Sequence, residues 1–168
     1  AVDSTHSFTT CIRLDFTVTG GTLDTDYIYQ NGVLIFTRPG DYTVSTTSPG
    51  ATTTNTIVVN ASGSSAANPV KIILDGVKIN VSGTSGAGSF DIMNGSTVSL
   101  TLSGTNTLQS ASNTAGLHVR TGASLIIGGD GTLTATGGNN GAGIGGNMNE
   151  SGGAVTITGG TVNANGGE

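Results

Sequence analysis

The sequence predicts an all-β chain that folds as a right-handed, three-faced parallel β-helix (a solenoid) of about five coils with an N-terminal capping strand. Three observations carry this prediction. The 168 residues include 29 Gly and only 9 % charged residues, and Gly, Thr, Ser, Asn and β-branched residues are poor helix formers. Apolar residues alternate with polar ones in short runs, as in half-buried strands. One strand–corner–strand phrase recurs along the chain, and such repetition indicates stacked units.

The chain is expected to form one domain behind a short arm. Residues 1–24 are the predicted N-terminal arm and cap, and residues 25–168 are the predicted coils. The apolar residues of the capping strand fall at alternate positions, namely Ile12, Leu14, Phe16 and Val18. Residues 25–46 are interpreted as an early, less regular coil. The chain ends inside the repeating pattern, which favours a fragment of a longer protein.

The repeat itself consists of a strand, a Gly-centred corner and a second strand, with a third strand before each copy. The four copies cover residues 70–83, 96–110, 123–138 and 153–167. The preceding strands cover residues 55–60, 89–94, 116–121 and 142–147. With the residue before the corner as anchor, Leu74, Leu102, Ile127 and Ile157 lie 28, 25 and 30 residues apart. Three short strands in 25–30 residues are typical of one coil of a three-faced solenoid.

The inner face of each strand is predicted from the alternation, because side chains of a strand point to opposite faces in turn. The first predicted inner column is Phe90, Ile92, Leu117, Val119 and Ile144. The second is Ile72, Leu74, Val98, Leu100, Leu125, Ile127, Val155 and Ile157. The third is Ile79, Leu108, Leu133 and Val162. Gly and Asn at each break supply the positive φ angles that corners require.

Composition excludes several classes of function. The net charge is −5 and no basic stripe is present, so nucleic-acid binding is not expected. No apolar stretch approaches the roughly 18 residues that span a bilayer. The single cysteine, Cys11, excludes an internal disulfide. A polar, lysine-poor surface rich in Thr, Asn and Gly is typical of exported bacterial proteins, so a secreted or cell-surface location is expected.

Three segments carry a resemblance to a known kind of module. Residues 19–34, 53–59 and 115–167, above all the phrases GAGIGGN and SGGAVTITGGTVNANGG, resemble a Gly-rich parallel β-helix repeat of Gram-positive bacterial cell-surface proteins. Such modules are similar in fold to pectate-lyase-like solenoids, and several are described as carbohydrate-binding. The resemblance therefore implies contact with a polysaccharide or another cell-surface glycan. No catalytic motif of the lyases occurs in the sequence.

A charged cluster is predicted on the outer side of the first strand of each coil. If Gly95 and Gly122 occupy equivalent corners, Asp91 and His118 are outward neighbours one coil apart, and Arg120 lies beside them. Asn147 follows in the column of Arg120. These charged and amide groups could hydrogen-bond sugar hydroxyls, or they could form an ordinary exposed ion pair worth about 0–1 kcal/mol.

Two weaker candidate sites lie near the N-terminus. Asp24 and Asp26 form a D-x-D turn of the kind that can ligate Ca²⁺, although a calcium site needs about six to eight oxygens. A pair of carboxylates beside a strand is the alternative interpretation. Tyr27 and Tyr29 share one face of a strand. Pointing outwards they would stack on a sugar ring, and pointing inwards they would cover the open end of the core.

The sequence favours a non-catalytic bacterial surface module that binds polysaccharide or acts in adhesion. A passive stalk without a ligand is the main alternative. A polysaccharide lyase would need a base such as Arg120 beside Asp91, and an ice-binding face would need unbroken threonine ladders. No cofactor other than Ca²⁺ is suggested. The final coil offers unpaired strand edges, which favour end-to-end self-association.

Overall fold

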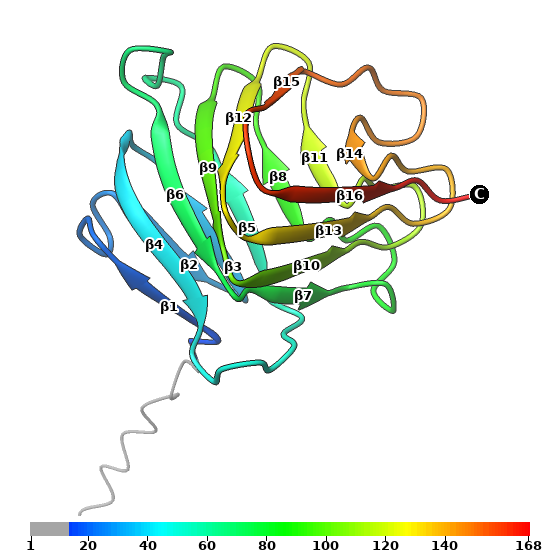
Figure 1. Ribbon diagram of the computed structural model, residues 1–168, viewed down its shortest axis with the longest axis horizontal. Helices are drawn as coiled ribbons and strands as arrows, with labels where there is room; N and C mark the ends of the chain where they lie inside the picture. The colour runs from blue at the N-terminus through cyan, green and yellow to red at the C-terminus, as the bar shows by residue number, and fades with distance from the viewer. Residues whose placement is uncertain (1–13) are drawn as a thin grey trace, which may run out of the picture.

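The structure is a computed structural model that describes residues 14–168, and this part of the chain is an all-β solenoid without helices. Three sheets form the faces of the solenoid (Figure 1). Sheet A contains β1 (Phe16–Thr19), β4 (Gly40–Thr46), β6 (Val70–Asp75), β9 (Thr97–Ser103), β12 (Ser124–Gly129) and β15 (Ala154–Ile157). Sheet B contains β2 (Tyr27–Gln30), β3 (Val33–Phe36), β5 (Thr56–Val59), β8 (Phe90–Ile92), β11 (Leu117–Val119) and β14 (Ile144–Gly145). Sheet C contains β7 (Lys78–Asn80), β10 (Thr105–Gln109), β13 (Thr132–Thr136) and β16 (Thr161–Asn165).

Each coil passes through sheet B, then sheet A, then sheet C. About four turns are stacked in this way, beginning with β5, β6 and β7 and ending with β14, β15 and β16. Equivalent strands of successive turns pair in parallel. Residues 25–46, which the repeat predicted as a first coil, contribute the parallel strands β3 and β4 to two of the three sheets. The predicted parallel β-solenoid is confirmed, whereas its right hand and its fifth coil stay predictions.

The N-terminal end of the solenoid is covered in all three sheets. Strand β1 pairs antiparallel with β4, where the sequence predicted a capping strand, and β2 pairs antiparallel with β3. At sheet C, Thr53 accepts a hydrogen bond from Asn80 and donates one to Lys78 through the backbone, both at 2.9 Å. The antiparallel strands satisfy backbone groups that an open sheet edge would leave unpaired.

The interior is lined by aliphatic side chains that alternate with outward polar ones. Nearly all the predicted inner residues are buried, including those of β8, β11, β6, β9 and β12. The prediction is wrong for Val155 and Ile157, which were assigned to the core but are exposed. They belong to β15, and within residues 14–168 no further strand packs on that side of the coil. Cys11 and Ile12 lie outside the described residues.

The register of the coils differs from the predicted one by two residues at two places. Leu102 pairs with Leu74 as predicted, but its partner on the next coil is Gly129, and Ile127 pairs with Leu100. In sheet C, Leu133 pairs with Asn106 rather than with Leu108. A slip of two residues keeps the same side chains inside, so alternation alone does not reveal it.

At the corner between sheets A and C, one buried side chain forms hydrogen bonds with backbone groups. The Oδ1 atom of Asn106 accepts a hydrogen bond from the Val77 amide at 2.8 Å, and its Nδ2 atom donates to the carbonyls of Ser103 and Thr132. On the next coil Gly129 has a φ of +95°, and a Cβ there would lie 2.4 Å from the Leu102 carbonyl oxygen. This corner therefore requires glycine.

Candidate functional site

The predicted charged cluster lies on the outer side of sheet B. Asp91 of β8 and His118 of β11 are direct partners in the parallel register. Phe90 and Ile92 flank Asp91 and point into the core, so the alternation of the strand directs Asp91 outwards. The same argument applies to His118. The adjacency that the repeat predicted is therefore confirmed.

Asp91 is the centre of the cluster. Its Oδ1 and Oδ2 atoms accept hydrogen bonds from Nε and Nη2 of Arg120 at 3.0 and 2.7 Å. The Oδ1 atom also lies 3.1 Å from Nδ1 of His118. A two-pronged contact of this kind holds the guanidinium in one orientation. The carboxylate therefore positions Arg120 at the surface and His118 beneath it.

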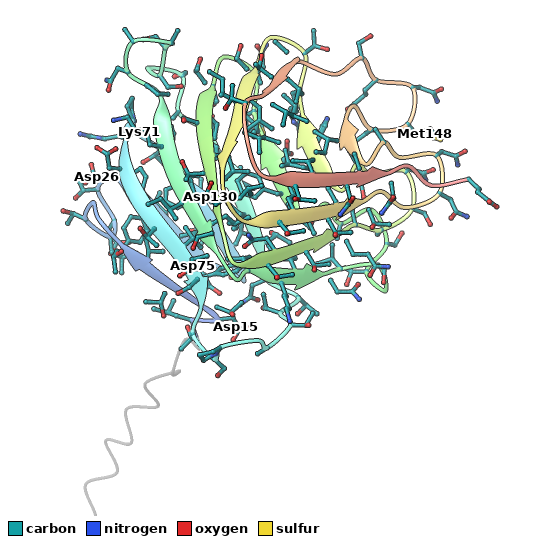
Figure 2. All side chains as sticks on the ribbon, viewed as in Figure 1. Asp15, Asp26, Lys71, Asp75, Asp130 and Met148 are labelled. Carbon is teal, nitrogen blue, oxygen red and sulfur yellow. The ribbon has the colours of Figure 1, made fainter. Side chains whose placement is uncertain are left out.

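The loop of residues 146–152 covers His118, and Met148 of this loop is labelled in Figure 2. The Asn147 Oδ1 atom accepts a hydrogen bond from the Ala115 amide at 2.9 Å, and its Nδ2 atom lies 3.3 Å from Nδ1 of His118. Glu150 places Oε2 3.1 Å from Nε2 of His118, although that nitrogen has no aligned hydrogen-bond acceptor among the described residues. These contacts enclose the imidazole.

Two expectations for the cluster are corrected by this loop. His118 points away from the core as predicted, but it is only 3 % exposed and is no surface ligand. Asn147 contacts His118 instead of continuing the column of Arg120. Glu150 was not predicted to belong to the cluster. It lies in the loop between the strands at 144–145 and 154–157, where the sequence departs from the repeat. That departure was the only feature of the sequence that could have indicated an unusual contact here.

The ion pair alters the pKa values of both partners. Burial alone would raise the pKa of Asp91, but hydrogen bonds from His118 and Arg120 outweigh it and hold that pKa below its usual range. The hydrogen bond with Asp91 raises the pKa of Arg120. Both groups are therefore charged at neutral pH, and the pair is a fixed feature of this surface.

A shallow depression adjoins the covered histidine. It has a volume of about 390 Å³ and is lined by Asn94, Arg120, Thr121, Glu150 and Ser151. The Arg120 side chain is 41 % exposed, and its Nη1 atom has no hydrogen-bond partner among residues 14–168. The Thr121 hydroxyl donates to the Ser151 carbonyl at 2.8 Å and holds the loop in place. The depression thus offers a donor and a carboxylate side by side.

Tyr27 and Tyr29 pack towards the core. The Tyr27 ring lies 6.0 Å from that of Phe36, and the Tyr29 ring lies 6.4 Å from that of Phe16 in an edge-to-face arrangement. The hydroxyl of Tyr29 contacts the side-chain amide of Asn55. This arrangement corresponds to the inward alternative, in which the rings cover the end of the core rather than form an exposed stacking pair.

The structure does not bring further acidic residues to Asp24 and Asp26. Asp26 accepts a hydrogen bond from the Thr22 amide at 2.9 Å, and Asp24 occupies the turn with a φ of +65°. Asp41, further along the chain, pairs with Lys71 at 3.0 Å. Among residues 14–168 no group of three His, Cys, Asp or Glu converges as metal ligands would. Calcium binding at Asp24 and Asp26 stays a prediction.

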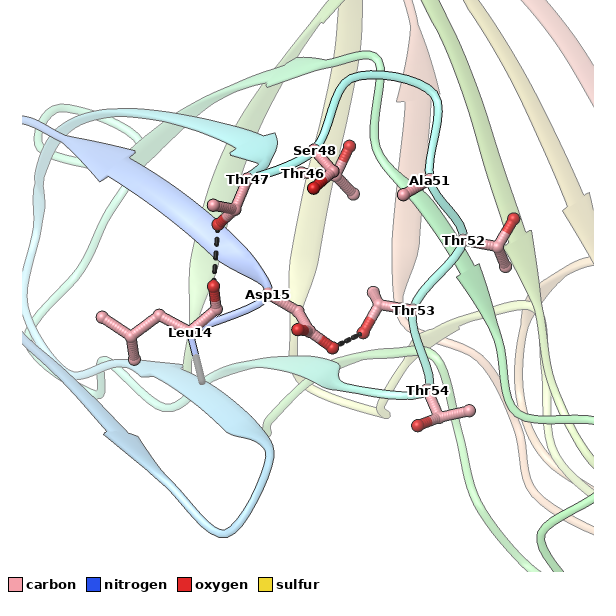
Figure 3. A pocket seen from close by; sticks show the side chains of 9 residues that line it. All are labelled: Leu14, Asp15, Thr46, Thr47, Ser48, Ala51, Thr52, Thr53 and Thr54. Atoms are coloured by element: carbon pink, nitrogen blue, oxygen red, sulfur yellow. Dashed lines mark hydrogen bonds between the residues drawn. The ribbon is translucent and has the colours of Figure 1, made fainter. Parts of the chain in front are cut away.

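A second hollow lies at the N-terminal end (Figure 3). It has a volume of about 280 Å³ and is lined by Leu14, Asp15 and residues 46–48 and 51–54. Two of its hydroxyl groups are engaged internally, since Thr53 donates to Asp15 at 2.6 Å and Thr47 donates to the Leu14 carbonyl at 2.8 Å. These contacts fasten β1 to the loop after β4.

Comparison with known proteins finds no relative of this chain. No protein-family model matches the chain, and no curated protein and no solved structure is significantly similar to it. Among the described residues, no helix has the length and apolar character that crossing a membrane requires. The geometry of the chain itself therefore has to support any functional assignment.

Proposed function

We propose that this chain is a non-catalytic, glycan-binding module of a secreted or cell-surface protein. One observation carries the proposal, namely a depression that is lined by both the oriented guanidinium of Arg120 and the half-exposed carboxylate of Glu150. Adjacent hydroxyls of a sugar act as donors and acceptors at once. A fixed N–H donor beside a carboxylate acceptor is complementary to such a pair.

A neutral glycan fits this depression better than an acidic one. The net charge of the chain is −5, so long-range electrostatics disfavour the approach of a polyanion. Asp91 already compensates the charge of Arg120, and Glu150 adds a negative charge at the rim. The expected ligand is therefore a hydroxyl-rich, uncharged polysaccharide.

The enclosed histidine supports a role in binding rather than in catalysis. A general acid or base must reach the reacting group, and His118 is enclosed by Asp91, Asn147 and Glu150. The carboxylate of Asp91 is engaged by Arg120 through both oxygens. These residues therefore act as positioning residues for the depression in the proposed module.

The proposal predicts that Glu150→Gln lowers the affinity for neutral polysaccharide about tenfold, since the substitution weakens one charge-assisted hydrogen bond and keeps the shape. Calorimetric titration with neutral and acidic polysaccharides is the measurement. Thr134→Ala on the outer side of sheet C is the matched control and should bind like the parent chain. A chain that binds no glycan would instead favour the passive spacer. If Glu150→Gln binds glycan with the same affinity as the parent chain, this depression is not the binding site.

We also propose that the chain self-associates through its last coil. Ile157 is 54 % exposed, and the outer edges of β14, β15 and β16 pair with no other strand of the described chain. Such edges accept further strands. Light scattering should show a mass that rises with concentration, and Ile157→Lys should suppress the rise while Asn163→Lys on the outer side of β16 should not. A chain that stays monomeric at millimolar concentration would rule this association out.

A further inference from the structure

The outer side of sheet C carries a regular array of uncharged polar side chains. Leu108 and Leu133 are buried in the core and Val162 packs against it, so the alternate residues of these strands face outwards. The outward positions are 105, 107 and 109 on β10, 132, 134 and 136 on β13, and 161, 163 and 165 on β16. Six of these nine residues are threonine, two are asparagine and one is glutamine.

The register aligns these residues in rows across the coils. Thr105 pairs with Thr132 and Thr132 pairs with Thr161, so the first row is threonine throughout. In the second row Thr134 pairs with Thr107, whereas the register predicted from the repeat would place it beside Gln109. Figure 1 shows β10, β13 and β16 stacked and running in nearly the same direction. An unbroken threonine ladder is therefore present over three coils.

The side chains of the array are not used inside the protein. None of the nine forms a side-chain hydrogen bond with another residue among 14–168, and Thr132 accepts one only through its backbone carbonyl. Threonine hydroxyls elsewhere are engaged, since those of Thr114, Thr121 and Thr158 donate to backbone carbonyls. The array thus presents its donors and acceptors to whatever lies outside the molecule.

The array recurs in two directions and carries no charge at its nine positions. Lys78 lies at the edge of the sheet, as the partner of Thr107. The strand spacing of about 4.8 Å is common to all sheets, and the distinguishing feature here is the same hydroxyl at neighbouring sites, both along β13 and across the coils. Liquid water can bond any exposed hydroxyl, whatever its position. Regular placement matters only to a partner whose own groups are fixed in a repeating pattern.

Threonine is suited to contact with ordered water. Its branched Cβ restricts χ1, so its hydroxyl is held in place with little further loss of side-chain entropy. The hydroxyl is both a donor and an acceptor, as is each water molecule in ice, and ice carries no net charge. Hydroxyls at repeating positions can bond several molecules of one ice surface at once, and these contacts reinforce one another because both partners are rigid.

We propose that the outer side of sheet C binds ice, with the threonine rows as the contact surface. The site does not rest on the proposed glycan-binding function, because the depression beside Arg120 lies on the outer side of sheet B. Chains attached to an ice crystal in this way would hold back the advancing crystal surface and slow its growth.

The test is the growth of a single ice crystal in a solution of the chain, observed just below the melting point. The parent chain should shape the crystal into facets and lower the temperature at which it grows. Thr132→Lys, at the centre of the array, should abolish both effects, because an ammonium group is strongly hydrated and its long stem covers the neighbouring hydroxyls. Thr134→Lys, in the second row, should act in the same way.

The matched control is Thr101→Lys. Thr101 is an exposed threonine on a central strand of sheet A, so the substitution adds the same charge outside the array and should leave the effect on ice unchanged. All three variants should fold, since each replaces an outward side chain, and circular dichroism checks this.

The outcomes separate this proposal from the proposed function. A parent chain that does not alter ice growth at millimolar concentration overturns the proposal. Unchanged activity in Thr132→Lys, or equal losses in Thr132→Lys and Thr101→Lys, also overturns it. Glu150→Gln should act on ice like the parent chain, and Thr132→Lys should bind glycan like the parent chain. Loss of both activities in Thr132→Lys would overturn the assignment of this face to ice.

Discussion

Replacing Ile127 with aspartate is expected to unfold the chain or prevent its accumulation. The Ile127 side chain is fully buried and is stacked between Leu100 and Ile157 of the adjacent coils. The substitution removes an aliphatic contact and places an unpaired charge in the core, which costs more than about 4 kcal/mol. Because each coil supports its neighbours, the loss should extend along the solenoid. Circular dichroism and urea denaturation measure the effect.

The matched control for this substitution is Thr134→Asp. Thr134 lies on the outer side of sheet C, between Thr107 and Asn163, where an added carboxylate remains in water. Its effect on the free energy of unfolding should be less than about 1 kcal/mol, as for most surface substitutions. Similar effects at the two positions would mean that the inward and outward faces have been assigned incorrectly.

Replacing Asp91 with asparagine is expected to destabilise the chain by about 1.5–3 kcal/mol at neutral pH, the usual worth of a hydrogen bond to a charged group. The substitution leaves Arg120 without its carboxylate and His118 with a weaker partner in an enclosed position. Asp130→Asn, at an exposed corner, is the control and should have little effect. Urea denaturation of the three chains gives the comparison.

The effect of Asp91→Asn should depend on pH with a definite sign. The folded chain holds the pKa of Asp91 below its ordinary value of 3.8. The ionised carboxylate therefore stabilises the fold fully above the pKa of the unfolded chain, and this stabilisation is lost as the pH falls through the lower folded value. The difference in unfolding free energy between the parent and Asp91→Asn should be constant near neutrality and shrink below about pH 4. A difference that grows in acid would contradict the assignment of Asp91 as the ionised partner.

The proximity of Asp91 and His118 could be predicted because the fold converts sequence period into spatial neighbours. In a parallel solenoid a residue lies beside its equivalent one coil away, so two residues separated by one repeat are partners in the sheet. The same logic correctly identified the inward side of most strands. Because side chains alternate, placing one residue of a strand inside the core fixes the direction of all the others. Fold class and one half of the candidate site followed from these local rules.

Glu150 and the burial of His118 could not be predicted in this way. Both depend on the loop of residues 146–152, most of which lies between the predicted strand at 142–147 and the repeat copy at 153–167. Its path is set by single contacts with distant residues, such as Asn147 with the Ala115 amide and Ser151 with the Thr121 hydroxyl. The side on which such a loop folds is decided by packing. No periodic property of its own residues indicates that side.

The outer side of sheet A illustrates the same division. The sequence by itself determined that Ile73 and Thr101 lie in strands of successive coils, because apolar alternation and Gly-centred corners specify a stacked parallel fold. Their direct pairing follows from the predicted match of Leu74 with Leu102, whereas only the tertiary structure decided that Thr101 lies beside Gly128 rather than Ile126. The coils differ in length, and a slip of two residues preserves the buried face at almost no cost to the pattern. Hydrogen-bond register and corner geometry, rather than hydrophobic burial, determine which residues are neighbours on the outer surface.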